Sequence, residues 1–190
     1  IGDTNPDIVF HLASQPLVRH SYDAPLETAT TNILGSAHVL EALRQNEIDC
    51  PVVVVTSDKC YENDGTSRAF SETDPLGGHD IYSASKAAVE IMTRSWQRAF
   101  KGRIATARAG NVIGGGDYGV DRIVPDCVRA LETSESIAVR SPDATRPWQH
   151  VLDCLSGYLW LGARLADDES FASAFNFGPT PEAQRPVREL

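Results

Sequence analysis

Short apolar runs alternate along the chain with longer segments that repeat apolar residues at helical spacing. The runs are typical of strands buried on both faces of a parallel sheet, and they occupy residues 8–12, 52–56, 103–108 and 174–177. Helices are predicted at residues 23–46, 80–100, 120–131 and 153–165, and a further short strand at 137–140. This alternation predicts an α/β fold with helices on both faces of a parallel sheet.

Three local signals refine the predicted helices. Asp23 is expected to cap the first long helix, with Pro25 in its first turn. The third helix is expected to break near Pro125. In the last helix, the spacing places Leu155, Leu159 and Gly162 on one face. Functional sites in such sheets lie at the carboxyl ends of strands, so the residues after Leu12, Thr56 and Arg108 become the candidates.

Composition and charge narrow the possible functions. Acidic residues outnumber basic ones by 26 to 17, and this net charge of −9 disfavours binding to nucleic acid. No apolar run approaches the ~20 residues of a membrane helix, so we expect no membrane segment. The four cysteines form no C-x-x-C pair. We therefore expect free thiols, a cytoplasmic protein and no metal site, rather than disulfides or zinc.

The strongest candidate chemistry is the pair Tyr82 and Lys86, which lie four residues apart in a predicted helix. This spacing places the phenol and the ammonium on one helix face. A nearby cation favours the phenolate and lowers the tyrosine pKa from its usual ~10, which suits Tyr82 to act as a general base. A surface Tyr–Lys pair is the ordinary alternative. The functional interpretation is preferred because the helix follows the strand that ends beside Ser57.

Ser57, Asp58 and Lys59 follow directly on a predicted strand. Ser57 is expected to hydrogen-bond a substrate hydroxyl, while Asp58 and Lys59 add two proton-transfer groups beyond Tyr82. A simple alcohol oxidation needs only one such group, so the run indicates work on both a C–H and a C–OH bond. Mutual attraction favours an ionised Asp58 and a charged Lys59. An acid role for Asp58 and a base role for Lys59 require the opposite protonation states, which burial and the substrate would have to favour.

Two further motifs lie in the second half of the chain. Gly114, Gly116 and Gly119 satisfy G-x-G-x-x-G, but the segment lies far from a first strand–helix turn, so we interpret it as a flexible loop over a site. Arg122 and Arg146 are expected to form a local positive patch suited to phosphate. The alternative interpretation is that the segment around Arg146 is only an edge strand.

Several stretches, in one order along nearly the whole chain, resemble the extended short-chain dehydrogenase/reductase family. They are residues 11–19, 31–35, 56–63, 74–86, 107–117 and 146–151. Within the family, Ser57-Asp58-Lys59 is similar to the nucleotide-sugar 4,6-dehydratases, whose dTDP-sugar members usually show Thr-Asp-Glu at that place.

The resemblance implies the fold, the reaction and the site residues. The fold is the second part of a Rossmann-like doubly wound parallel sheet, with a partial smaller substrate-binding domain. The reaction is NAD-dependent dehydration of CDP-glucose: oxidation at C4, loss of water across C5 and C6, and reduction at C6. The implied catalytic residues are Ser57, Asp58, Lys59, Tyr82 and Lys86. The implied NAD contacts are Leu12, Ala13, Ser14, Thr31, Tyr82, Lys86 and Arg108, and the implied substrate contacts are Asn111, Arg122 and Arg146.

The resemblance also implies how the chain is organised. Residues 1–112 are expected to belong to the NAD-binding domain and residues 113–190 to the nucleotide-sugar-binding region, with segments near 151–177 returning to the first. Both ends are expected to be truncated, because the family's Gly-rich cofactor turn would precede Ile1. A homodimer is expected through the helices at 25–46 and 80–100. The alternatives are another nucleotide-sugar dehydratase or 4-epimerase, or a non-catalytic nucleotide-sugar-binding fragment.

Overall fold

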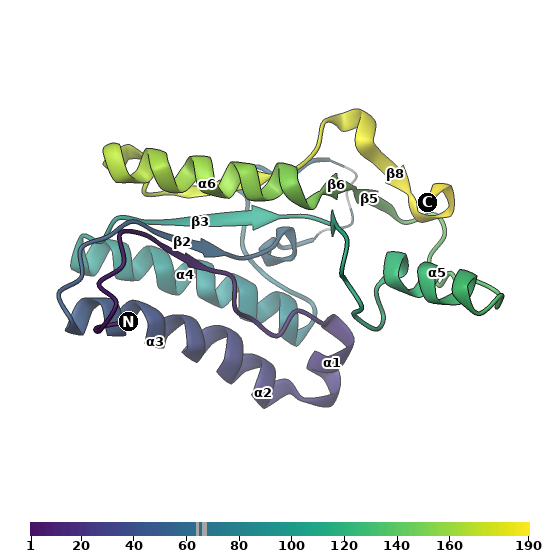
Figure 1. Cartoon of the computed structure of the whole chain (residues 1–190), viewed down its shortest axis with the longest axis horizontal. Coiled ribbons are helices and arrows are strands. Elements are labelled where there is room, and N and C mark those ends of the chain that lie inside the picture. Colours follow the sequence, from purple (N-terminus) through teal and green to yellow (C-terminus); the bar gives the residue numbers. More distant parts are fainter. Residues whose placement is uncertain (64, 66–67) are drawn as a thin grey trace. The chain divides into compact units, whose positions relative to one another are not determined.

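A four-stranded parallel sheet forms the centre of the first of two compact units (Figure 1). The computed structural model describes residues 1–63, 65 and 68–190. Unit 1 comprises Ile1–Ala109 and Ser156–Phe177, and unit 2 comprises Gly110–Leu155 and Gly178–Leu190. The strands of the sheet lie in the order β1-β2-β3-β7. Their bounds are Val9–His11 for β1, Val52–Val55 for β2, Ile104–Ala109 for β3 and Ala174–Phe177 for β7.

All three strand pairings are parallel, with Val9 opposite Val52, Val52 opposite Ile104, and Thr106 opposite Ala174. Every residue of β3 is buried, as expected for a strand covered on both faces. All four predicted strands of this sheet are present to within one or two residues. The predicted parallel α/β sheet is thus confirmed.

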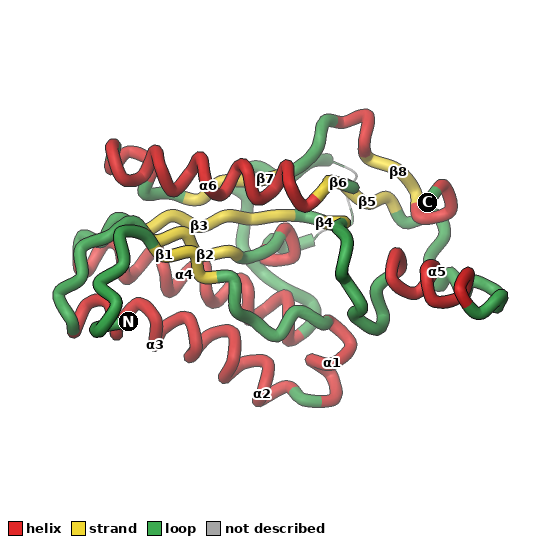
Figure 2. The backbone as a smooth tube through the Cα atoms, in the orientation of Figure 1, coloured by secondary structure: helices red, strands yellow, loops and turns green. Residues whose placement is uncertain are grey.

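Helices cover both faces of this sheet (Figures 1 and 2). On one face, α3 (Gly35–Gln45) and α4 (Ile81–Phe100) pack Leu40, Leu43 and Val89 into a core with the strands. Asp80 caps α4, since its carboxylate accepts from the backbone N–H of Ser83. On the other face lies the unit 1 part of α6 (Val151–Asp167). A side chain at Gly162 would collide with Phe10 of β1, so glycine permits this close packing.

The first long helix differs from its prediction. Asp23 is the last residue of a separate helix, α1 (Val18–Asp23), rather than a cap. The chain bends at Ala24, and Pro25 then starts α2 (Pro25–Ala29), since proline fits a first helical turn but not a helix interior. A π-helical segment, Thr30–Leu34, joins α2 to α3. Such π turns occur frequently at functional sites.

Two further expectations for helices and strands are wrong. The helix α5 (Ile123–Glu132) is continuous, because Pro125 lies in its first turn, where proline is tolerated. Residues 137–140 form no strand. Leu155, Leu159 and Gly162 lie on one continuous helix, α6, at the spacing of a single face, as predicted. The buried residues of this helix include Tyr158, Leu161 and Leu165, whereas Leu155 and Leu159 are exposed.

Unit 2 contains two small sheets besides α5. The strands β4 (Val112–Ile113) and β6 (Gln149–His150) pair in parallel, and β5 (Thr145–Pro147) and β8 (Gln184–Pro186) pair antiparallel. Among the described residues, short 3-10 helices occupy Asp58–Cys60, Glu169–Phe171, Pro181–Ala183 and Val187–Glu189. Within the part of the chain that the structure describes, no helix is long and apolar enough to cross a membrane.

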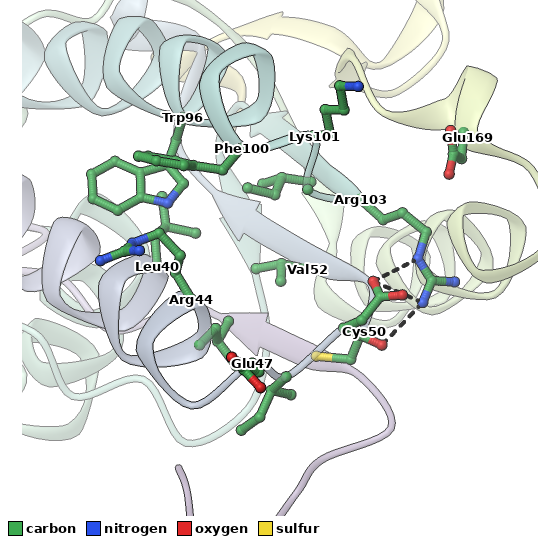
Figure 3. Close-up of a pocket in the computed structure, with 15 residues that line it drawn as sticks. Leu40, Arg44, Glu47, Cys50, Val52, Trp96, Phe100, Lys101, Arg103 and Glu169 are labelled. Carbon is green, nitrogen blue, oxygen red and sulfur yellow. Dashed lines mark hydrogen bonds and ion pairs between the residues drawn. The ribbon is translucent and has the colours of Figure 1, made fainter.

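A pocket opens in unit 1 at the amino ends of β2 and β3 (Figure 3). Its walls include Leu40 and Arg44 of α3, Trp96 and Phe100 of α4, and Arg103. Arg103 donates to Asp49 across its rim. Sites in parallel α/β sheets lie at the opposite, carboxyl ends of the strands, so this pocket is not the candidate active site.

Candidate active site

Ser57, Asp58 and Lys59 lie at the carboxyl end of β2, as the sequence predicts. The strand continues through Thr56, whose N–H donates to Ala107 of β3 at 2.8 Å. The chain then turns into a single 3-10 turn that Ser57 caps, since its hydroxyl accepts from the Lys59 N–H. The same hydroxyl donates to Asp58 Oδ1 at 3.1 Å. Lys59 is exposed and Asp58 is half-buried, so both groups remain within reach of a substrate.

Tyr82 and Lys86 lie one turn apart near the start of α4, and both are buried. The Lys86 Nζ lies 5.9 Å from the centre of the Tyr82 ring. It also donates to the carbonyl oxygen of Val55, the last residue of β2, at 3.5 Å. Burial lowers the pKa of Lys86 to about 8, against the opposing effect of Glu90. The fold therefore brings the Tyr82–Lys86 turn to the strand end that carries Ser57.

The segment after β1 contains Leu12, Ala13 and Ser14. It is held in place by Asn32, which the sequence analysis did not single out as a functional residue. Leu12 and Ala13 are exposed. Asn32, in the π-helical segment beside the exposed Thr31, accepts from the Gln15 N–H at 2.7 Å and donates to the Gln15 carbonyl. It also donates to Ser85 Oγ, which donates in turn to the Tyr82 carbonyl. Asn32 thus joins the loop after β1 to the turn that carries Tyr82. The signal for Asn32 in the sequence was a polar residue within a segment whose apolar spacing predicts a helix.

Replacing Asn32 with alanine is expected to lower the free energy of unfolding by about 1–3 kcal/mol, because it leaves buried polar groups of Gln15 and Ser85 without their partner. Urea denaturation measures the change. Asn46→Ala is the matched control, since Asn46 makes one exposed hydrogen bond at the end of α3. Equal, small losses for the two variants would show that Asn32 does not hold this loop.

Arg108 is buried in unit 1, with a guanidinium that contacts protein groups. It forms an ion pair with Glu90 and donates to the Tyr61 hydroxyl and to the Glu72 carbonyl. The NAD contact that the family resemblance implies for Arg108 stays a prediction.

The three predicted substrate residues lie in unit 2. Asn111 precedes β4, and its carbonyl accepts from the N–H of Gln149. Arg122 precedes α5 and forms an ion pair with Asp117 at 3.0 Å. Arg146, in β5, donates to its neighbour's carbonyl. Their substrate roles stay predictions. Among the described residues, no group of three or more His, Cys, Asp and Glu side chains is placed to hold a metal ion.

The parallel sheet, the serine at a strand end and the Tyr–Lys pair on the following α-helix are the features that the resemblance to the extended short-chain dehydrogenase/reductase family implied. Residues 1–178 match the NAD dependent epimerase/dehydratase family, and the chain belongs to that family. The chain is 42% identical to the CDP-glucose 4,6-dehydratase of Salmonella typhimurium, across 98% of this chain and 55% of that protein. The chain thus spans about half the length of this relative.

Solved structures support the same fold. An epimerase from Methanothermobacter thermautotrophicus superposes with a TM-score of 0.84 at 26% identity, over 97% of this chain and 54% of that one. A dTDP-glucose 4,6-dehydratase from Streptomyces venezuelae, solved with NAD bound, gives a TM-score of 0.84 at 22% identity, over 96% of this chain and 54% of that one. The predicted Rossmann-like fold and the resemblance to the nucleotide-sugar dehydratases are confirmed.

Proposed function

We propose that the protein catalyses the NAD-dependent dehydration of CDP-glucose to CDP-4-keto-6-deoxyglucose. The observation that carries the proposal is the contact of Lys86 with the last residue of β2, which brings the Tyr82–Lys86 turn to the Ser57-Asp58-Lys59 run. These two segments supply a base for oxidation and two further groups for elimination. The identity with a CDP-glucose 4,6-dehydratase supports the choice of nucleotide and sugar.

The residues of unit 1 suit a dinucleotide at this edge of the sheet. Leu12 and Ala13 are exposed where β1 ends. Thr31 is also exposed, and it directly precedes Asn32, which accepts a hydrogen bond from the Gln15 N–H. Lys86 presents an ammonium with three N–H donors, of which one is directed at Val55. Leu12, Ala13, Ser14, Thr31, Tyr82 and Lys86 would hold NAD. The bound cofactor supplies a hydride acceptor in the first half of the reaction and a hydride donor in the second.

In the first half-reaction, Tyr82 takes the proton from the sugar 4-hydroxyl as hydride leaves C4. The ammonium of Lys86 stabilises the phenolate that accepts this proton, and Ser57 hydrogen-bonds the 4-oxygen. The resulting 4-ketone acidifies the C5 proton.

In the second half-reaction, Lys59 removes the C5 proton while Asp58 protonates the departing 6-hydroxyl, which leaves as water. Hydride then adds to C6, and Lys59 returns its proton to C5. Tyr82 has gained one proton and Asp58 has lost one, so a proton passes between them through solvent before the next turnover.

Mass spectrometry of the reaction tests the proposal, using the protein that contains this chain at its full length. CDP-glucose should yield a product lighter by one water, and dTDP-, GDP- and UDP-glucose should react far more slowly. A product of unchanged mass would indicate a 4-epimerase. Binding of CDP-glucose with no product would indicate a binding protein. Either outcome would contradict the proposal.

Arg146→Ala is expected to weaken binding of CDP-glucose by about 1.5–3 kcal/mol, because it removes a hydrogen bond to a charged phosphate. Binding of NAD should be little affected. Titration calorimetry with each ligand measures the two affinities. Arg164→Ala, which removes an exposed arginine of α6, is the control. An unchanged affinity for CDP-glucose would give Arg146 a structural role.

We further propose a cytoplasmic homodimer. The cysteines of the described residues are free, which suits a reducing compartment. Leu26 of α2, Leu34 of the π-helical segment, and Ile91 and Phe100 of α4 are exposed apolar side chains in the two segments, 25–46 and 80–100, expected at the dimer interface. Sedimentation at the monomer mass would contradict the dimer, and export of the protein from the cell would contradict the location.

A further inference from the structure

A buried ion pair that the proposed mechanism does not use lies behind the candidate active site. Glu90 of α4 and Arg108 of β3 are 3% and 5% exposed, and their Oε2 and Nη2 atoms lie 2.7 Å apart. A buried pair is costly to desolvate and is retained only where further hydrogen bonds satisfy it. Two of the partners of this pair, Thr56 and Tyr61, lie on either side of the Ser57-Asp58-Lys59 run.

The carboxylate of Glu90 holds the end of β2. One oxygen accepts from the Thr56 hydroxyl and the other accepts from the Thr106 hydroxyl at 2.7 Å. Thr56 directly precedes Ser57. Because both threonine hydroxyls are buried, loss of the carboxylate would leave them without this acceptor. Glu90 therefore fixes the point at which the Ser57-Asp58-Lys59 run leaves the sheet.

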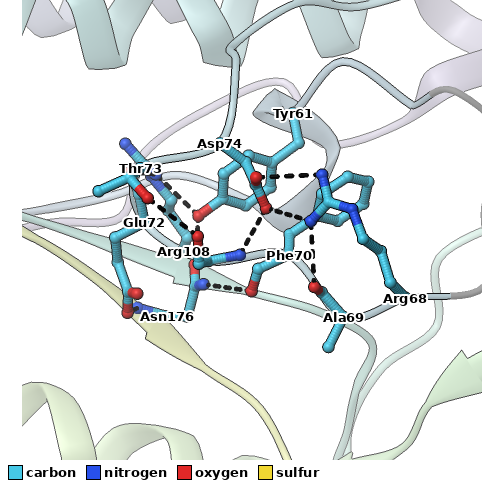
Figure 4. A network of polar contacts seen from close by, with 10 residues as sticks. Tyr61, Arg68, Ala69, Phe70, Glu72, Thr73, Asp74, Arg108 and Asn176 are labelled. Atoms are coloured by element: carbon cyan, nitrogen blue, oxygen red, sulfur yellow. Dashed lines mark hydrogen bonds and ion pairs between the residues drawn. The ribbon is translucent and has the colours of Figure 1, made fainter.

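The guanidinium of Arg108 holds the other end of the same run. It donates to the Tyr61 hydroxyl at 2.7 Å, and its carbon lies 4.9 Å from the centre of the Tyr61 ring. Tyr61 donates in turn to Asn176 of β7 at 2.6 Å, and Figure 4 shows Tyr61, Arg108 and Asn176 together. Tyr61 lies two residues after Lys59. The run is therefore anchored on both sides by one ion pair.

Glu90 also lies one helical turn after Lys86, so its charge acts on the Lys86 ammonium. Burial lowers the pKa of Lys86, and Glu90 opposes that effect. Other titratable groups face Lys86 from two elements. Cys60 also raises the pKa of Lys86. His11 of β1 has a lowered pKa, through burial first and the charge of Lys86 second.

We propose that Glu90 and Arg108 are positioning residues: the pair holds the Ser57–Lys59 run against the Tyr82–Lys86 turn, with the Glu90 carboxylate one helical turn from Lys86. The inference rests on the proposed function in treating Tyr82 and Lys86 as catalytic. The link between Glu90 and Lys86 is testable without turnover.

The test is a ¹³C NMR titration of the protein that contains this chain, labelled at the lysine Cε carbons. The lysines of the chain are Lys59, Lys86 and Lys101, and Lys→Arg variants assign their signals. In the wild type, Lys86 should titrate near pH 8. In Glu90→Gln its midpoint should fall by about one pH unit, because the nearby opposite charge is lost. The signals of Lys59 and Lys101 should not move.

Two further variants make the result decisive. Glu41→Gln removes an exposed carboxylate of α3 that pairs with Arg44, and it should leave the Lys86 midpoint unchanged. If Glu90→Gln does not fold because Arg108 is left unpaired, the double variant Glu90→Gln/Arg108→Met removes both charges and should still lower the midpoint. An unchanged Lys86 midpoint in the folded Glu90 variant would overturn the inference.

Turnover separates this inference from the proposed function. A lowered Lys86 midpoint, with a matching downward shift of the pH profile for CDP-glucose oxidation, supports both. A lowered midpoint in a protein that does not act on CDP-glucose supports the inference and contradicts the proposed function alone. A lowered midpoint with an unchanged pH profile in an active enzyme would overturn the positioning role, since Lys86 would then not govern the reaction.

Discussion

Tyr82→Phe is expected to slow the oxidation of CDP-glucose by about 10²–10⁴-fold with the fold intact, which is the usual effect of removing a positioned general base. Phenylalanine keeps the ring that lies beside Lys86 and loses only the hydroxyl. NADH absorbance after mixing enzyme, NAD and CDP-glucose measures the step, and circular dichroism reports the fold.

The matched control for this change is Tyr22→Phe, which removes an exposed hydroxyl on α1 and should leave the rate unaltered. Formation of the 4-keto product by Tyr82→Phe at close to the wild-type rate would remove Tyr82 from the mechanism.

Asp58→Asn is expected to separate oxidation from elimination. The first hydride step does not need Asp58, so the variant should still reduce NAD when CDP-glucose is added. Water should leave about 10²–10⁴-fold more slowly, since the 6-hydroxyl is a poor leaving group unless a general acid protonates it. NADH absorbance should therefore accumulate in place of the 6-deoxy product. Rapid-mixing absorbance and mass spectrometry follow the two steps.

Asparagine keeps the size of Asp58 and an oxygen that accepts from the Ser57 hydroxyl, so a folding defect is not expected. Asp49→Asn, at the amino end of the sheet beside Arg103, is the control and should behave as wild type. A normal rate of 6-deoxy product from Asp58→Asn would show that Asp58 is not the acid. Failure to reduce NAD would place Asp58 in the first step.

The sequence predicted the sheet well because its buried parallel strands form short, mostly apolar runs that alternate with longer helical segments. It also predicted α4 closely, since the helix expected at 80–100 is observed at Ile81–Phe100. It missed the break at Ala24 and the π-helical segment after Ala29. There the hydrogen bonds of Asn32 to Gln15 and Ser85, which are distant in sequence, accompany the departure from the regular helix.

The candidate site was predictable only in part. Motifs that are continuous in sequence, such as Tyr82 to Lys86, can be recognised from the spacing of their residues. The partners of Glu90 do not, because Thr56, Thr106 and Arg108 meet it only once the strands are paired. In a chain with many surface charges, nothing in the sequence marks Glu90 as buried. The position of Glu90 one turn after Lys86 becomes informative only once the structure shows that Glu90 is buried.

The path of the hydride tests the central claim most directly. CDP-glucose carrying deuterium at C4 is incubated with the protein and NAD, and the product is analysed by mass spectrometry and by NMR. If the chain belongs to a 4,6-dehydratase in which hydride leaves C4 and returns to C6, the deuterium should appear on the C6 methyl group of CDP-4-keto-6-deoxyglucose. Deuterium retained at C4 of a hexose of unchanged mass, or lost from the product altogether, would contradict this account.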